Sequence, residues 1–423
     1  MQFRRLFSSR PLRVLITIVA VSICLVSILI SGKFALSRVF IAYAMTMGNL
    51  AAADESIRLS PADAEAHFVR AEVLKTTGAT TQAVTELERA VALRPRDYFL
   101  WLELGFTRDQ ADDAAGALLA FNEAARLAPH YAQPLWQRGN LLLRSGRYDE
   151  AFDDLRRAAE SNPDLLPTLI DLAWGFSKGD PKVTEQLAQI TTSRMRIAFA
   201  GFLAKHGKGK EALEQFRGAG SVPEQARREL VQQLIALNAF AAAFELWKGG
   251  EGGGKDHQLS SVYDGGFEGP LSLEKTGFGW QIPRDLQGMN IALDPTQPHS
   301  GSKSLRIDFA GDSNPQSSLV SQLILVEPSI RYRINFAART QDLVTGGPPL
   351  AIVNDAAGEP KHLGQSASLR PGSNDWQVFS FEFTAEPATK AVVLSLQREN
   401  CTTSPCPIFG SLWLDSFSIE RVK

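Results

Sequence analysis

The chain has 423 residues, 21% of them charged, and a formal net charge of −2. This length exceeds what one hydrophobic core usually supports, so two or three domains are expected. A nearly neutral chain has no overall positive field, which argues against nucleic acid as a partner.

An uncharged apolar segment at residues 14–30 follows a basic N-terminus. The basic residues before it are Arg4, Arg5, Arg10 and Arg13. At about 1.5 Å per helical residue, the segment is near the minimum length that crosses a bilayer. A cleaved signal peptide is the alternative. Because no small-residue cleavage site closely follows Ile30, residues 11–31 are predicted to form an uncleaved, single-pass anchor in the inner (cytoplasmic) membrane. The arginine excess predicts that residues 1–10 are cytoplasmic and that the later domains lie in the periplasm or outside the cell.

A 34-residue period organises the chain after the apolar segment. Prolines and small residues recur at this interval, as expected where two packed helices approach closely and the second one ends. The recurring residues are Pro61, Pro95, Pro129 and Pro163; Ala71, Gly105 and Gly139; Ala83, Ala117 and Ala151; and Ala90, Ala124 and Ala158. The pattern resembles tetratricopeptide repeats over about residues 34–248. The resemblance implies an α-solenoid domain at 32–248 whose groove binds a protein partner.

Each repeat is expected to have a first helix (A helix) and a second helix (B helix). Residues 35–59 run in register into Pro61 and are predicted to form one B helix joining the membrane span to the solenoid. A-helix residues that point away from the B helices are expected to line the concave face, and the candidates are Arg70, Trp101, Arg108 and Arg138. For the arginines the alternative is an ordinary solvated charge, and for Trp101 it is packing.

Five glycines fall within residues 249–254, and a flexible linker is therefore predicted at 249–258. Beyond it the hydrophobic period changes from that of a helix to that of a strand, as at Tyr332, Ile334 and Phe336. Short alternating segments between turn residues predict an antiparallel β-sandwich at 259–423. The expected fold class is therefore multidomain α + β, with a transmembrane helix, an α-solenoid and a C-terminal sandwich.

An ordered set of motifs in the last segment resembles carbohydrate-binding modules of the galactose-binding-like jelly-roll type. The motifs are Gly265-Gly266-Phe267-Glu268, Gly279-Trp280, residues 300–307 and residues 412–419, within a match of about 260–423. In that family, a Glu and an Asp at the positions of Glu268 and Asp415 often bind a structural calcium. Calcium needs several oxygen ligands, so backbone carbonyls would complete the shell. The alternative is that both carboxylates cap turns or face solvent.

Polar residues on the outward side of the predicted strands are candidates for a glycan-binding face. They are Arg333, Asn335, Arg339 and Gln397. An ordinary solvated sheet face is the alternative. Trp280, Trp376 and Trp413 are expected in the core, because they fall at packing positions of the family. Cys401 and Cys406 lie close together in an apparent hairpin loop, and outside the cytoplasm they are expected to form a disulfide.

The sequence contains no recognisable catalytic or nucleotide-binding motif. No catalytic residue and no cofactor other than calcium are therefore predicted. The expected function is a membrane-anchored adaptor of the bacterial cell envelope, serving exopolysaccharide assembly or export, with a protein partner on the repeats and glycan on the sandwich. Two alternatives stay open: a glycan hydrolase or lyase that uses carboxylates of the sandwich, and a sandwich that docks proteins without affinity for sugar.

Overall fold

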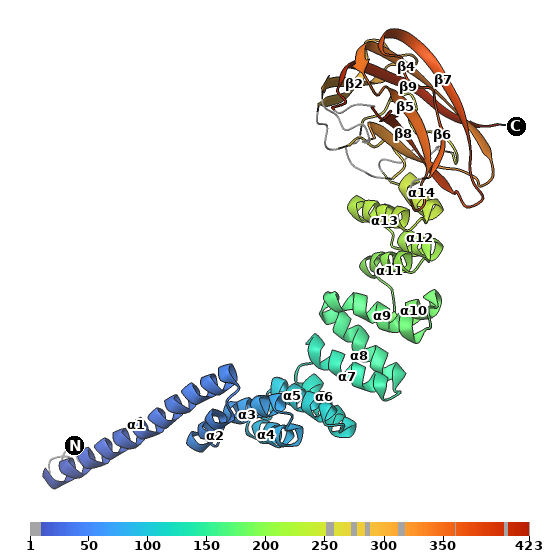
Figure 1. Ribbon diagram of the computed structural model, residues 1–423. Coiled ribbons are helices and arrows are strands. Elements are labelled where there is room, and N and C mark those ends of the chain that lie inside the picture. Colours follow the sequence, from blue (N-terminus) through green and yellow to red (C-terminus); the bar gives the residue numbers. More distant parts are fainter. Residues whose placement is uncertain are drawn as a thin grey trace, which may run out of the picture. The chain divides into compact units, whose positions relative to one another are not determined.

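The computed structural model describes residues 10–250, 258–271, 277–283, 288–311, 318–359, 361–401 and 405–422. Residues 251–257 of the predicted linker lie outside these ranges. The chain divides into two compact units, Met1–Gln189 and Ile190–Lys423. Figure 1 shows helices from the N-terminus onward and strands in the C-terminal part.

The first unit is built from successive helix pairs. The pairs are α1 (Arg10–Met47) with α2 (Leu50–Leu59), α3 (Ala64–Thr76) with α4 (Thr80–Leu93), α5 (Tyr98–Gln110) with α6 (Ala114–Leu127), α7 (Ala132–Arg144) with α8 (Tyr148–Ser161), and α9 (Leu166–Phe176) with α10 (Pro181–Ala188), with a short 3₁₀ turn at Pro163–Leu165. Asp63 and Asp97, one period apart, cap α3 and α5 through backbone N–H groups two residues later, at 3.1 Å in both cases. The helix starts therefore follow the period of the sequence.

The recurring small residues lie where an A helix meets its B helix. A Cβ atom added to Gly105 would lie 2.5 Å from the ring of Phe121 on α6, and one added to Gly139 would lie 2.8 Å from Leu155 on α8. Phe121 and Leu155 are both buried. The glycines thus let a large B-helix side chain fill the space against the A-helix backbone, which confirms the predicted repeat packing.

The prediction of one B helix at 35–59 is wrong. The helix that includes the apolar segment continues unbroken to Met47, and the chain turns at Gly48, whose φ is +61°. Asn49 then caps α2 by accepting a hydrogen bond from the backbone N–H of Ala52 at 2.9 Å. A left-handed glycine followed by a capping asparagine ends one helix and starts the next. The C-terminal part of α1 therefore serves as the A helix of an additional pair.

The second unit begins with two more helix pairs. They are α11 (Ser193–Lys205) with α12 (Gly209–Gly218), and α13 (Glu224–Ala236) with α14 (Phe240–Lys248). Paired helices therefore continue to Lys248. Trp247 on α14 makes ring contacts with Tyr263 and Phe278, at centroid distances of 5.1 and 5.6 Å. Trp247 of α14 therefore packs against residues of the β-strand region.

The β domain consists of two antiparallel sheets that share one core. The strands are β1 (Met289–Asp294), β2 (Ser304–Gly311), β3 (Val320–Leu325), β4 (Arg331–Thr345), β5 (Pro349–Asp355), β6 (His362–Gln365), β7 (Gly372–Thr384), β8 (Ala391–Arg398) and β9 (Ile408–Arg421). The five-stranded sheet has the order β1-β2-β9-β4-β7, and the four-stranded sheet has the order β3-β8-β5-β6. Tyr332, Ile334 and Phe336 all lie in the core, as their alternation predicted.

Candidate functional site

One helix among the described residues, Val14–Met47, is long and apolar enough to cross a membrane, and its most apolar window is fully exposed. A membrane anchor and a signal sequence share these properties. The same helix enters the repeat array directly: Ser37 Oγ donates a hydrogen bond to Ser56 O on α2 at 3.0 Å. Arg38 forms ion pairs with Asp63, at 3.0 Å, and with Glu65. The apolar segment and the A helix of the first pair are therefore parts of one continuous helix.

Direct contacts between consecutive A helices form a surface that we call the A-helix surface (Phe68, Lys75, Phe99, Glu103, Asp109 and Arg144). The Phe68 and Phe99 rings lie 5.4 Å apart, edge to face, and Phe99 is 41% exposed. Lys75 Nζ donates to Glu103 at 3.0 Å, and Arg144 pairs with Asp109. Burial lowers the pKa of Lys75, but hydrogen bonds to Glu72 and Glu103 outweigh it and raise the pKa overall. The surface thus combines an exposed aromatic ring with paired charges, a composition found in protein interfaces.

The expectation that the helix-A arginines line a groove away from the B helices is wrong. Arg138 lies between α6 and α8, with Nε and Nη2 both 2.6 Å from the Asp154 carboxylate and Nη1 3.0 Å from Asn122. Asp154 is buried. This hydrogen bond with Asp154 raises the pKa of Arg138. The pair borders a cavity of about 400 Å³ between these helices.

The other two arginines of that group also contact B helices. Arg70 bonds Asp54 on α2 at 2.6 Å and Glu86 on α4 at 3.0 Å. Arg108 reaches Glu88 on α4 at 2.6 Å and the Gly116 carbonyl on α6 at 3.1 Å. Trp101 is half-buried, packs against the core and donates to Pro95 O at 2.9 Å. Arg70 and Arg108 thus link neighbouring repeats, and Arg70 also pairs with the buried carboxylate of Glu86.

The candidate glycan face is divided between the two sheets. Arg333, Asn335 and Arg339 lie on β4 of the five-stranded sheet, whereas Gln397 lies on β8 of the other sheet. Arg333 pairs with Glu382 on β7 at 2.7 Å and with Glu420 on β9 at 3.4 Å. The Gln397 side chain donates to Ser395 Oγ at 3.0 Å. Only the three β4 residues can therefore contribute to one sheet face.

A stacked group on the five-stranded sheet was not foreseen from the sequence. Arg306 on β2 and Arg339 on β4 flank Trp413 on β9, with guanidinium carbons 4.9 and 5.1 Å from the ring centroid. Trp413 Nε1 donates to Asp294 Oδ2 at 2.8 Å. Burial raises the pKa of Asp294, but hydrogen bonds from Thr296 and Trp413 outweigh it and lower the pKa to about 2. The alternation of the strand predicts that Arg306 points outward. The strand register that places it beside Trp413, however, cannot be predicted from the sequence.

The three tryptophans differ in their surroundings. Trp280 lies in the core between Phe267 and Phe417, as expected. Trp413 is buried on the outer side of β9, whose neighbours Leu412 and Leu414 belong to the core. Trp376, by contrast, is only half-buried: its ring lies 5.5 Å from that of His299, and Nε1 donates to Gln297 O at 3.3 Å. Trp376 therefore gives the sheet edge a partly exposed aromatic ring.

Glu268 and Asp415 hold the same loop at residues 299–303. Asp415 Oδ2 accepts the backbone N–H groups of His299 and Ser300 at 2.8 and 2.9 Å. Glu268 Oε1 accepts that of Ser302 at 2.7 Å. The hydrogen bonds from Ser302 lower the pKa of Glu268. Asp415 is fully buried and Glu268 is exposed.

Gly266 adjoins both of these acidic side chains. A Cβ atom at this position would lie 3.7 Å from Asp415 Oδ1 and 3.9 Å from Glu268 Cγ. Their oxygen atoms suit a hard cation such as calcium. Within the described residues, however, no group of three or more His, Cys, Asp or Glu side chains is placed to hold a metal. Backbone carbonyls would have to supply most of the ligands.

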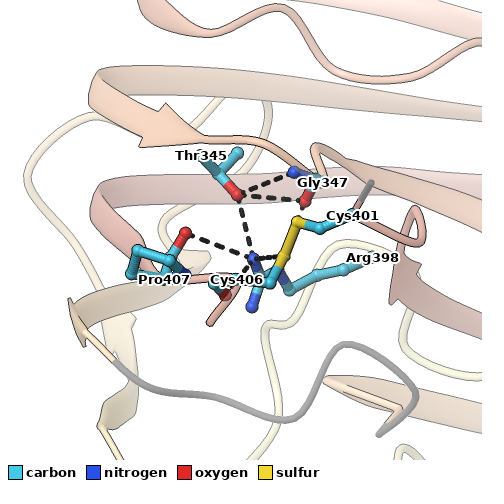
Figure 2. Close-up of a disulfide and its surroundings, with 6 residues drawn as sticks. All are labelled: Thr345, Gly347, Arg398, Cys401, Cys406 and Pro407. Atoms are coloured by element: carbon cyan, nitrogen blue, oxygen red, sulfur yellow. Dashed lines mark hydrogen bonds between the residues drawn. A yellow bond between two sulfur atoms is a disulfide. The ribbon is translucent and has the colours of Figure 1, made fainter. Parts of the chain in front are cut away.

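The structure joins Cys401 and Cys406 by a disulfide next to the start of β9 (Figure 2). The buried Arg398 side chain lies beside it, and its Nη2 donates to Cys406 O at 2.8 Å and to Thr345 Oγ1 at 2.9 Å. Burial lowers the pKa of Arg398. The guanidinium thus ties the disulfide loop to the end of β4.

Comparisons with known proteins support the repeat assignment. The family described as "Tetratricopeptide repeat" matches residues 132–165, which is the unit that begins at Ala132. The chain is 29% identical over 176 residues to Protein FlbA of Caulobacter vibrioides, which is 41% of this chain and 26% of that protein. It is 28% identical over 102 residues to human DnaJ homolog subfamily C member 3, which is 24% of this chain and 20% of that protein. The chain thus spans about a quarter or less of these relatives.

Solved structures with local similarity include MamA and a CBM4 module. The MamA match has 18% identity and a TM-score of 0.29, and it covers 32% of this chain and 79% of that one. The structure titled "CBM4 structure and function" has 15% identity and a TM-score of 0.29, and it covers 38% of this chain and 99% of that one. These TM-scores are too low to support an argument. What is shown is a tetratricopeptide-type repeat region, followed by an antiparallel β domain.

Proposed function

We propose that this chain is a membrane-anchored adaptor of the bacterial cell envelope that holds a protein partner on its repeats. The observation that carries the proposal is the continuity of α1, whose exposed apolar segment leads without a break into the first helix pair. Repeat arrays of this kind mediate protein–protein contacts. The match to a Caulobacter protein supports a bacterial setting. The arginines before the span favour a periplasmic location for the remaining domains.

Anchoring is tested on the full chain in membranes. We expect the chain to resist extraction with alkaline carbonate. We also expect protease added to intact spheroplasts to digest the domains after the span. Recovery of a soluble form that begins near residue 32 would show a cleaved signal and contradict the anchor.

The partner site is assigned to the A-helix surface. Phe99→Asp introduces a charge at its exposed ring and is expected to abolish capture of the partner from solubilised envelope. Leu119→Asp is the matched control, because Leu119 is a 68% exposed apolar residue on α6. Equal loss of capture in both variants, or in neither, would contradict this assignment.

For the β domain we propose a jelly-roll glycan-binding module that serves polysaccharide assembly or export. Its binding surface would combine the half-buried Trp376 and His299 with the β4 face of Arg333, Asn335 and Arg339, since sugar rings stack on partly exposed aromatic side chains. Affinity electrophoresis of the full chain through gels that contain envelope polysaccharide should show retardation, which Trp376→Ala removes. Unchanged mobility of the wild-type chain would favour a protein-docking module instead.

A structural calcium at Glu268 and Asp415 is part of this proposal, with the loop at 299–303 next to it. When bound, calcium would neutralise the two carboxylates at the junction of the first and last parts of the β domain. The enzyme alternative would need such a carboxylate pair to be free for substrate. Both carboxylates instead accept backbone N–H groups of one loop, an arrangement that suits a structural role.

A further inference from the structure

One face of α1 is apolar and exposed over a length greater than the thickness of a bilayer. The helix residues Val14–Met47 number 34 and span about 51 Å at ~1.5 Å per residue. The hydrocarbon core of a bilayer is about 30 Å thick, so about 14 of these residues extend past it. A tilt that buried all of them would exceed the usual range of about 0–40°.

The packing of the first helix pair shows which residues extend past the membrane. Ile41 and Ala44 form a small core with Ala52, Ala53 and residues of α3. The helices around this core also carry charged groups, among them the ion pair of Arg38 with Asp63 and that of Arg58 with Glu55 on α2. Because charged groups do not enter hydrocarbon without a large cost, α1 from about Ser37 onward lies outside the bilayer.

The side of α1 opposite Ile41 is nonetheless hydrophobic. Leu36, Val39 and Tyr43 are 47%, 63% and 49% exposed. Lys33 and Arg38 are the only charged residues between positions 14 and 53 of the sequence, and Arg38 is paired with Asp63. An exposed apolar strip of this kind usually marks an interface.

The spacing of this strip is that of a coiled-coil seam. Residues 25, 29, 32, 36, 39 and 43 alternate steps of four and three, and they are Leu, Leu, Gly, Leu, Val and Tyr. We call this set the α1 seam. It runs from the apolar segment into the extramembrane part of α1 without a break, and all six positions are exposed. A 3.5-residue hydrophobic period keeps one face of a helix against a partner helix along its whole length.

We propose that the α1 seam pairs with the α1 seam of a second copy of this chain, forming a parallel dimer. This inference rests on the anchoring proposed above, because copies inserted in one membrane share one orientation. Each seam residue then meets its own counterpart across a two-fold axis. No like charges oppose each other on the seam, and confinement to the membrane raises the effective concentration of the helices. A different membrane protein is the competing occupant, and the tests below would reveal it.

Cysteine cross-linking distinguishes the two occupants. Starting from a full-length Cys24→Ser chain, which lacks the free thiol of the span, single cysteines are placed at Leu36, Val39 or Tyr43. Met45→Cys is the matched control, because Met45 is exposed on the same helix but lies off the seam. After oxidation in membranes, the disulfide-linked dimer is expected to be several-fold more abundant for the three seam positions. Equal yields at Val39 and Met45, or none at Val39, would overturn the dimer.

A mass measurement makes the test independent of membrane insertion. The full chain in detergent micelles is expected to have twice the monomer mass, Val39→Glu to have the monomer mass, and Met45→Glu to remain dimeric. Both sites are exposed, so neither variant should disturb folding. A wild-type monomer would overturn the dimer while leaving the anchor intact. Release of the chain by alkaline carbonate, with a dimer still present in micelles, would instead contradict only the anchor.

Discussion

Gly105 offers the sharpest test of the repeat register. In Gly105→Ala, the added Cβ would lie 2.5 Å from the Phe121 ring, whereas carbon atoms pack at about 3.5–4.0 Å. The ring must therefore retreat by about 1 Å, yet it is buried and meets Phe106 edge to face at 5.7 Å. Overpacking of this kind costs about 1–3 kcal/mol, from which a gain in helix propensity of up to about 1 kcal/mol is subtracted. With the full gain subtracted, the net expectation is a loss of up to about 2 kcal/mol.

Gly175→Ala is the matched control within the same unit. Nothing lies within 4 Å of a Cβ at Gly175 on α9, so only the helix propensity changes and the variant should gain up to about 1 kcal/mol. For a unit of this size, each kcal/mol shifts the melting temperature by about 2–4 °C. Circular dichroism melts of the full chain in detergent should therefore move in opposite directions for the two variants. A Gly105→Ala chain that melts at or above the wild-type temperature would refute the register.

Three further outcomes are expected in the β domain. The pKa of Asp294 is lowered from 3.8 to about 2, so its ionised form contributes about 2–3 kcal/mol above about pH 4, and this is lost as the pH falls towards 2. Urea unfolding should show Asp294→Asn less stable than wild type at pH 7, and the gap should close near pH 2; a constant gap would contradict this. Non-reducing mass spectrometry of exported protein should show Cys401 linked to Cys406, and free thiols at both would argue for cytoplasmic residence. Chelation of calcium should lower the melting temperature of wild type but not of Glu268→Ala, and an unchanged wild-type curve would exclude calcium.

Much of the helical fold was predictable because tetratricopeptide-type packing repeats the same contact every 34 residues. Gly105 and Gly139 mark close helix crossings in the sequence, and the structure places a B-helix side chain against each. The strands were predictable because Tyr332, Ile334 and Phe336 alternate with polar residues, and all three are buried. Local patterns of this kind carry their own structural information.

The functional surfaces were less predictable because they depend on contacts between distant residues. The Arg138 side chain sits between α6 and α8, and its Asp154 partner is 16 positions away. The periodicity gives no sign of which side of the A helix it occupies. The Arg306–Trp413–Arg339 stack requires the register of three strands, which alternation alone does not fix. The turn at Gly48 was missed because a single glycine in an apolar run is a weak stop signal.

Charged side chains of the repeats are paired with one another, which limits how a partner can be recognised. Arg70 and Arg138 are held by the buried carboxylates of Glu86 and Asp154, and on the A-helix surface Lys75 is already paired with Glu103. Little net charge is left there to attract a partner, whereas the Phe99 ring is exposed. Apolar burial depends weakly on ionic strength, while attraction between exposed charges is largely screened at about 0.15 M salt. We therefore expect partner capture to change little between low salt and 0.5 M salt, and a steep fall would place the partner site elsewhere on the repeats.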